Sequence, residues 1–180
     1  MKQKEASFFG GAMRDTTTKE YKDSVLIGGF LAEKGYIVNN GGYGGLMEAV
    51  SKGVAEAGGE VYGWTCETFG KGKGNKYLTE EHRQPDIYKR LRYLIGHDES
   101  SSIFYTDVFV VQKGGIGTLA ELFLAWDVFR KNKTTKTRIY LIGEHWNAIL
   151  TALEPVTSEK EMKLIIVCED FEDFKIKFKE

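Results

Sequence analysis

The sequence predicts an α/β fold: one doubly wound, Rossmann-like parallel sheet with helices packed on its faces. Three observations predict it. Short apolar segments alternate with segments of helical periodicity from one end of the chain to the other. Glycine-rich turns join apolar segments to the helices that follow them. No linker, repeat or low-complexity tract divides the 180 residues, so residues 1–180 are expected to form a single domain.

The first half of the chain shows the alternation clearly. Ala6–Phe9 is a short apolar run that predicts a strand, and in Tyr21–Phe30 the apolar side chains recur at helical spacing. Tyr36–Val38 predicts the second strand. Leu46–Ala57 returns to helical spacing, with apolar side chains four residues apart, and Glu60–Trp64 predicts the third strand.

The second half begins with an interruption of this order. Thr65–Leu78 is rich in glycine and lysine and lacks periodicity, which predicts a mobile loop. One apolar helix face then runs from Ile87 to Ile95, and the unbroken apolar run Val108–Val111 predicts a strand buried on both faces. Helices and strands are then expected in turn over Gly114–Lys131, Arg138–Ile142, Trp146–Leu153, Leu164–Val167 and Phe171–Phe178.

Composition excludes several functional classes. With 25 basic and 26 acidic residues the net charge is −1, which gives no electrostatic reason to expect nucleic acid or an anionic membrane as partner. No stretch approaches the roughly 18 apolar residues of a membrane helix, and no apolar signal segment opens the chain. A cytoplasmic protein is therefore expected. Cys66 and Cys168 are far apart and the histidines share no ligand spacing, so neither a disulfide nor a metal site is expected.

Two glycine-rich turns, Gly41–Met47 and Lys113–Thr118, each follow a predicted strand and open a predicted helix. Glycine lets backbone amides approach a ligand closely, and a helix N-terminus supplies unpaired N–H groups and a positive dipole end. One such turn is explained by turn geometry alone, but two at neighbouring strand ends of one sheet favour phosphate binding. The candidate phosphate-binding residues are Gly10, Gly42, Gly44, Gly45, Lys113, Gly114, Gly115, Ile116, Gly117 and Thr118.

The second turn continues into Thr118-Leu119-Ala120-Glu121, which has two interpretations. In a capping box the threonine hydroxyl caps the helix and the glutamate reaches back to it. Alternatively the Glu121 carboxylate faces a ligand, where it stabilises an oxocarbenium-like centre or positions water. Spacing alone favours the capping box. Arg90 and Arg92, on an earlier helix, point either to the sheet end or into solvent.

Together these motifs resemble the Lonely Guy family, whose members are often mislabelled as lysine decarboxylases. Members carry Gly-Gly-Gly-x-x-Gly-Leu-Met, whose last seven positions correspond here to Gly41–Met47. They also carry Pro-Gly-Gly-x-Gly-Thr-x-x-Glu, which corresponds to Lys113–Glu121. The order and spacing of motifs and strands agree from about Ala6 to Val167, nearly the whole chain.

The resemblance implies a homodimeric phosphoribohydrolase that cleaves the N-glycosidic bond of a nucleoside 5′-monophosphate, releasing the base and ribose 5-phosphate. It implies that Glu121 is the catalytic carboxylate, against the capping interpretation, and that the glycine amides hold the phosphate. Arg90 is the best match to the family's catalytic arginine, because Tyr93 and Leu94 follow it, and Arg92 is the competing assignment. No cofactor is expected, since no lysine stands in a pyridoxal phosphate setting.

Three departures from the family pattern motivate an alternative. Lys113 replaces the usual proline, the family's Glu-Arg-Lys triplet is not reproduced around Arg90, and His97–Tyr105 resembles an insertion. The alternative is a non-catalytic protein of the same fold that binds or carries a nucleotide or a phosphorylated, pterin-like cofactor.

Several apolar helix positions have two possible roles. Trp126, Phe129 and the Leu94-Ile95 pair belong either to the core of one chain or to an isologous contact between two subunits. The sequence does not separate these roles.

Overall fold

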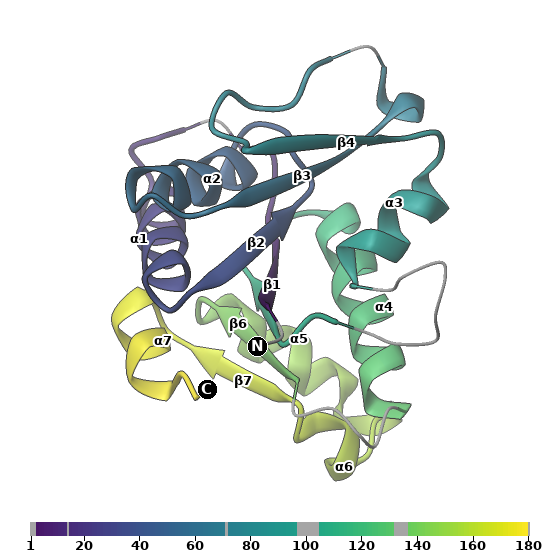
Figure 1. Cartoon of the computed structure of the whole chain (residues 1–180). Helices are drawn as coiled ribbons and strands as arrows, with labels where there is room; N and C mark the ends of the chain where they lie inside the picture. Colours follow the sequence, from purple (N-terminus) through teal and green to yellow (C-terminus); the bar gives the residue numbers. More distant parts are fainter. Residues whose placement is uncertain (1–2, 14, 71, 97–104, 132–136, 180) are drawn as a thin grey trace.

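The computed structural model describes residues 3–13, 15–70, 72–96, 105–131 and 137–179. Its centre is one parallel sheet (Figure 1). In chain order the strands of this sheet are β1 Lys4–Phe9, β2 Tyr36–Asn40, β3 Val61–Cys66, β4 Glu80–Gln84, β5 Val108–Val111, β6 Arg138–Ile142 and β7 Ile165–Cys168. The predicted fold class is confirmed.

The strand order is β4-β3-β2-β1-β5-β6-β7, and all six pairings are parallel. The chain therefore winds outward from β1 in one direction, then returns to the other side of β1 and winds outward from β5. The reversal between β1 and β5 is the topological switch point, where ligands of open α/β sheets bind beyond the carboxyl ends of the strands.

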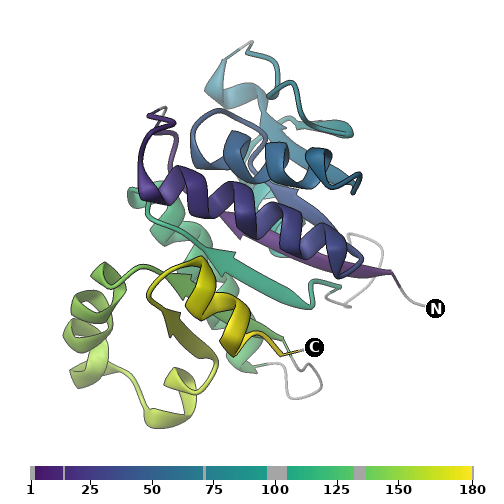
Figure 2. The same ribbon diagram turned by 90° about the vertical axis from the view of Figure 1, so that its left-hand side faces the viewer.

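Helices cover both faces of the sheet (Figure 2). One face carries α1 Lys19–Glu33, α2 Leu46–Glu56 and α7 Phe171–Lys177, and the other carries α3 Ile87–Leu94, α4 Ile116–Lys131 and α5 His145–Leu153. The short elements are η1 Glu67–Phe69, η2 Glu154–Val156 and α6 Glu159–Met162. This arrangement gives the two helical layers of a doubly wound domain.

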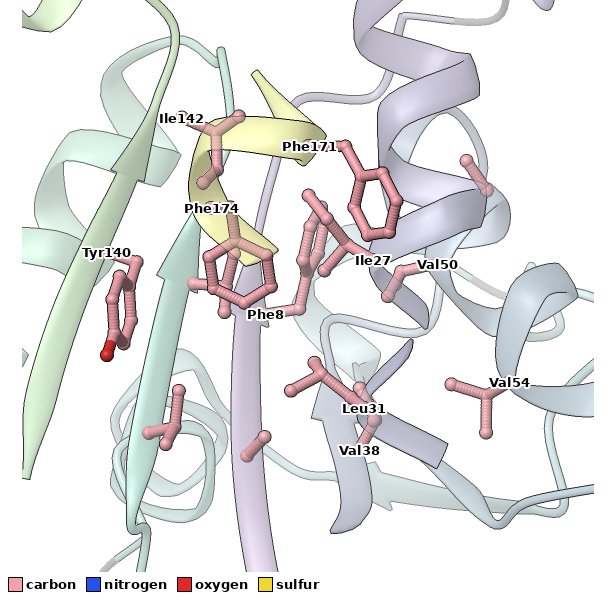
Figure 3. Close-up of a cluster of buried hydrophobic side chains, with 14 of the residues drawn as sticks. Phe8, Ile27, Leu31, Val38, Val50, Val54, Tyr140, Ile142, Phe171 and Phe174 are labelled. Atoms are coloured by element: carbon pink, nitrogen blue, oxygen red, sulfur yellow. The ribbon is translucent and has the colours of Figure 1, made fainter. Parts of the chain in front are cut away.

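The core consists of two apolar layers, one on each face. Figure 3 shows the layer under α1, α2 and α7, in which Phe8, Ile27 and Phe174 are fully buried. Within β5 the side chains alternate between the layers: Val108 and Val110 pack in one, and Phe109 and Val111 in the other. The prediction that Val108–Val111 is buried on both faces is thus confirmed.

The prediction missed β4, an edge strand of sequence Glu-Glu-His-Arg-Gln. It lacks an apolar face because its side chains make polar and ring contacts instead: Glu81 accepts a hydrogen bond from Thr65 (2.7 Å), and His82 stacks on Trp64. The remaining predicted strands and helices are present, with ends shifted by a few residues. Gly35 follows α1 with φ of +78°, as expected for a C-terminal cap.

The two glycine-rich turns follow β2 and β5, which lie on either side of β1. The prediction that these turns follow neighbouring strands is therefore wrong, because β1 lies between them. The turn after β1 joins them. The Gly11 N–H donates to the Lys113 carbonyl (3.0 Å), and the Gly11 carbonyl accepts from the Leu46 N–H (2.9 Å). Three turns are thereby held together at the carboxyl edge of the sheet.

The apolar positions with two possible roles are buried within the chain. Leu94, Ile95, Trp126 and Phe129 are all at most 5% exposed and pack against the sheet, so of the two roles the structure shows the core of one chain. Both Cys66 and Cys168 are buried and free. Over the described part of the chain, no helix has the length and apolar character needed to span a bilayer.

Candidate functional site

A cavity of about 400 Å³ lies at the switch point, beyond the carboxyl ends of the strands. This volume falls in the range of small-molecule sites, which is about 300–1,000 Å³. The turn after β1 forms its floor through Gly10, Gly11 and Ala12. Its sides come from the turn after β2, from η1, from α3 and from the N-terminus of α4.

Arg90, on α3, reaches into this cavity and is 5% exposed. Its Nε donates to the Trp64 carbonyl (2.7 Å), and its Nη2 donates to the Gly41 carbonyl (3.5 Å). A Cβ atom at Gly41 would collide with the guanidinium, so the first glycine of the turn makes room for Arg90. The arginine is therefore fixed by backbone acceptors from two different strand ends.

Glu121, on α4, lies opposite Arg90 in the cavity, and its Oε1 accepts a hydrogen bond from Arg90 Nη1 (3.1 Å). Both side chains of this ion pair are buried. Burial raises the pKa of the Glu121 carboxyl, and the positive charge of Arg90 offsets the increase only in part. The cavity thus contains a carboxyl group whose affinity for a proton is raised.

The capping interpretation of Glu121 is wrong. Helix α4 begins at Ile116, so Thr118 is already its third residue, and the Glu121 carboxylate turns to Arg90 on another helix. The motif spacing matches a capping box, but a helix capped by Thr118 would begin at Leu119, and α4 begins three residues earlier. Thr118 is buried and lines the cavity.

The turn before α4 exposes backbone to the cavity. Gly115, Ile116 and Gly117 line it, and a Cβ added at Gly115 or Gly117 would meet nothing within 4 Å. The Leu119 N–H donates to the Gly115 carbonyl (3.1 Å) and closes the first helical turn. N–H groups before such a bond have no acceptor within the helix and attract anions.

Four of the other predicted phosphate-binding glycines support the turns without lining the cavity: Gly42, Gly44, Gly45 and Gly114. The Gly42 N–H donates to Asn40 Oδ1 (2.7 Å), and Gly42 has φ of +79°. Gly45, with φ of +72°, packs so closely on Ala12 that a Cβ would collide with its backbone. Gly44 is half-buried, and Gly114 has no room for a Cβ beside Thr118 Oγ1. Gly10 lines the cavity floor and packs against Phe8 and Leu46.

Two predicted basic residues lie away from the cavity. Lys113 directs its amine to Glu20 on α1 (3.2 Å), and Arg92 is exposed on α3. Neither lines the cavity, so of the two candidate arginines the structure brings only Arg90 to Glu121.

Sequence reasoning missed the apolar side of the cavity. Tyr43 and Met47 from the first glycine-rich segment line it, together with Phe69 from η1 and Ile87 and Leu91 from α3. A signal existed for Tyr43, because it stands between two glycine pairs at a strand end. Phe69 carried none, since it falls in a segment without periodicity.

Among the described residues, no group of three or more histidine, cysteine, aspartate or glutamate side chains is arranged to hold a metal ion. His97 and most of the expected insertion lie outside the described residues, and only Tyr105 of that segment is described.

A family model described as possible lysine decarboxylase matches residues 47–177, which include Met47, Arg90 and the whole α4 motif. The chain belongs to this family. The resemblance to the Lonely Guy family, which bears the same description, is confirmed. The match spans both sides of the Arg90–Glu121 pair.

The chain is similar in sequence to one protein and in structure to two others described here. An uncharacterized protein of Archaeoglobus fulgidus is 28% identical over 149 residues, which cover 79% of this chain and 87% of that protein. The molybdenum cofactor binding protein of Rippkaea orientalis has a similar structure, with a TM-score of 0.74, 17% identity, and coverage of 98% and 95% of the two chains. The molybdenum cofactor carrier protein of Chlamydomonas reinhardtii has a TM-score of 0.67 and 20% identity, and the match covers 97% of this chain and 94% of that protein. These structural likenesses show a shared fold.

Proposed function

We propose that this protein is a phosphoribohydrolase, which cleaves the N-glycosidic bond of a nucleoside 5′-monophosphate. The observation that carries the proposal is the buried Arg90–Glu121 pair (3.1 Å) in the cavity at the switch point. Membership of the Lonely Guy family supports it, because that resemblance implies this reaction and makes Glu121 the catalytic carboxylate.

The phosphate is proposed to bind at the N-terminus of α4. Gly115 and Gly117 have no φ above zero and no neighbour that excludes a side chain, so the fold itself does not demand glycine there. A ligand that approaches the backbone closely does demand it. The helix dipole and the free N–H groups of the first turn favour the negative charge of a phosphate.

The Glu121 carboxylate is proposed to act on the ribose. In the hydrolysis, the C1′–N bond breaks and its electron pair goes to the base nitrogen. Water adds its oxygen to C1′, and its proton is passed by the carboxylate to the departing base. The carboxylate also stabilises the positive charge that develops at C1′. Its raised pKa suits a group that must take up a proton during this step.

The test is release of ribose 5-phosphate from AMP, GMP, CMP and UMP. Glu121→Gln is expected to lower turnover by a factor of about 10²–10⁴, the usual contribution of a general base. Asp127→Asn is the matched control, because Asp127 is on the same helix, pairs with Lys131 and Arg130, and does not line the cavity. Normal turnover by Glu121→Gln would refute the assignment.

A second candidate function is supported by a different observation. The described residues that line the cavity include one carboxyl group and no histidine or lysine, so none is available as a separate acid for the leaving base. A protein that carries a phosphorylated cofactor needs no such acid. The fold shared with molybdenum cofactor binding and carrier proteins supports this alternative, in which the ligand is a phosphorylated pterin.

The same panel separates the two functions. A carrier is expected to release no ribose 5-phosphate from any nucleotide. It should instead retain a phosphorylated pterin through purification from cells, which mass spectrometry of the denatured protein detects. Release of base from any of the four nucleotides, lost in Glu121→Gln, would decide for the hydrolase.

We also propose a homodimer, which the family resemblance implies. Exposed apolar side chains of α3 and α4 support it: Tyr88 on α3 is 79% exposed, and Ile116 and Phe123 on α4 are 81% and 39% exposed. Sedimentation velocity of the wild type and of Phe123→Glu tests the proposal, and a monomeric wild type would overturn it.

A further inference from the structure

Two aromatic rings form one wall of the cavity. Tyr43 and Phe69 both line it, with ring centroids 6.2 Å apart and planes at 60°. The Arg90 guanidinium lies close to both rings, with Cζ 5.9 Å from the Tyr43 centroid and 5.5 Å from that of Phe69. The rings therefore lie on the same side of the cavity as the arginine that faces Glu121.

The Tyr43 ring is held in place by its own hydroxyl. Tyr43 Oη accepts a hydrogen bond from the Cys66 N–H (2.8 Å) and lies 3.2 Å from the Cys66 carbonyl, to which it donates. The phenol hydroxyl thereby uses both its donor and its acceptor on the backbone at the end of β3. The hydroxyl serves to orient the ring, and the face of the ring is what remains for a ligand.

Phe69 is presented at the cavity although it is 55% exposed. Its backbone is fixed by the polar edge strand: Arg83 on β4 donates to the carbonyl of Gly70 and to that of Gly72 (2.9 Å). Gly70 itself has φ of +96°, which ends η1 in a sharp turn. A large apolar side chain on an anchored turn at a cavity mouth is suited to cover a ligand.

The side chains around these two rings offer few groups that could read a base edge. Met47, Ile87 and Leu91 also line the cavity and are apolar. The polar side chains of the lining are Arg90, Glu121, Thr118 and Tyr43, and the Tyr43 hydroxyl is already engaged. The side chains left to hydrogen-bond a ligand are therefore Thr118 and the Arg90–Glu121 pair, which is already assigned to the ribose in the proposed function.

We infer that Tyr43 and Phe69 form a stacking wall that selects ligands with a planar heterocycle, whatever hydrogen-bonding pattern the edge of that ring presents. The inference rests on the proposed phosphate site at α4 and adds the ring as the second determinant of affinity. Every base has a π-face, so stacking tolerates different bases. Purine and pyrimidine monophosphates are expected to bind, with the larger ring bound more tightly.

The experiment compares ligands with and without a ring by titration calorimetry. Formycin 5′-monophosphate carries a purine-like ring on a carbon–carbon glycosidic bond, so hydrolysis cannot remove it during the measurement. Ribose 5-phosphate lacks the ring. Phe69→Leu and Tyr43→Leu are each expected to weaken formycin 5′-monophosphate about tenfold, within the range measured for base–aromatic stacking. Binding of ribose 5-phosphate is expected to stay unchanged in Phe69→Leu.

Two controls identify the ring as the cause. Phe69→Tyr keeps an aromatic face and is expected to bind both ligands as the wild type does. Tyr62→Leu removes a half-buried aromatic residue of β3 that does not line the cavity, and it is expected to have no effect on either affinity. Because Phe69 is more than half exposed, its replacement by leucine leaves the buried core intact.

The outcomes separate this inference from the proposed function. If ribose 5-phosphate and formycin 5′-monophosphate bind equally well, or if Phe69→Leu and Tyr43→Leu leave both affinities unchanged, the stacking wall is wrong while the phosphate site stands. If neither compound binds the wild-type protein, the proposed phosphate site fails and the stacking wall fails with it.

Discussion

The two glycine-rich turns look alike in sequence but serve different purposes in the structure. In the first, Gly41 makes room for Arg90, and Gly42 and Gly45 have φ values of +79° and +72°. In the second, a side chain at Gly115 or Gly117 would enter open space beside the cavity. The first turn needs Gly41, Gly42 and Gly45 for its own conformation and packing, whereas the fold does not require Gly115 or Gly117.

This difference shows how a ligand site can be recognised in a glycine motif. A glycine demanded by backbone conformation or packing would be kept in a protein that binds nothing. A glycine that the fold would replace at no cost indicates that space must stay open. By this criterion we assign the proposed phosphate site to the N-terminus of α4, whereas the turn after β2 supplies Tyr43 and Met47 to the cavity lining.

The largest effect is expected from Gly45→Ala. Its backbone angles, φ +72° and ψ −132°, are accessible to glycine and strained for alanine, and the added methyl would collide with the Ala12 backbone. We expect a loss of about 3 kcal/mol or more in the free energy of unfolding. Urea denaturation measures it. A loss below about 1 kcal/mol would mean that the first turn is not dictated by the fold.

The next largest effect is a pH dependence of the unfolding free energy that comes from the Glu121 carboxyl on α4. Burial raises the pKa of Glu121 above 4.5, so the folded protein holds this proton more strongly than the unfolded chain. The stability that results is fully present below pH 4.5 and is lost as the pH rises through the raised pKa. The loss has a maximum slope of about 1.4 kcal/mol per pH unit.

Glu121→Gln cannot titrate and should lack this slope. Denaturation of both proteins between pH 4.5 and pH 8 checks the prediction. The difference in slope is the relevant quantity, because removal of the partner of buried Arg90 also adds an offset that does not change with pH. Equal slopes for the two proteins would show that Arg90 fully compensates the burial of Glu121.

Much of the fold was predictable from the sequence because its signals are local. Val108–Val111 reads as a strand buried on both faces, and Arg138–Ile142 is bounded as predicted. The edge strand β4 was not predictable, since its polar side chains are satisfied by residues distant in sequence, such as Thr65. A periodic apolar pattern arises from buried side chains, and no side chain of this strand is fully buried.

The site was predictable to a different degree. Glu121 and Arg90 were candidates, but their pairing spans 31 residues and depends on where α4 begins, which the spacing of Thr118 and Glu121 misrepresents. The choice between Arg90 and Arg92 required the orientation of α3. Phe69 enters the cavity through the anchoring of its turn by Arg83, a contact with no local pattern.

A smaller effect is expected from Gly117→Ala, which should raise the stability of the protein and lower its affinity for the ligand. Gly117 is the second residue of α4, and alanine is favoured over glycine in a helix, so the unfolding free energy should rise by about 0.4–1 kcal/mol. Gly117 lines the cavity, so a methyl group there is expected to hinder close approach of a phosphate to the backbone and to lower the affinity for ribose 5-phosphate. Thermal denaturation and calorimetry on one preparation measure both. Unchanged affinity would move the phosphate site away from α4.

The smallest effect is expected from Lys113→Ala, although a lysine beside a phosphate-binding turn suggests a ligand contact. The Lys113 amine pairs with Glu20 (3.2 Å), and both side chains are too exposed for the pair to contribute more than about 0.5 kcal/mol. The Lys113 backbone, whose carbonyl accepts from Gly11 N–H, is untouched by the substitution. We therefore expect unfolding and ribose 5-phosphate binding close to the wild type, measured at low salt, where any charge effect is largest. A clear loss of affinity would show that the Lys113 side chain contacts the ligand. The proposal that backbone amides at the N-terminus of α4 bind the phosphate without Lys113 would then be wrong.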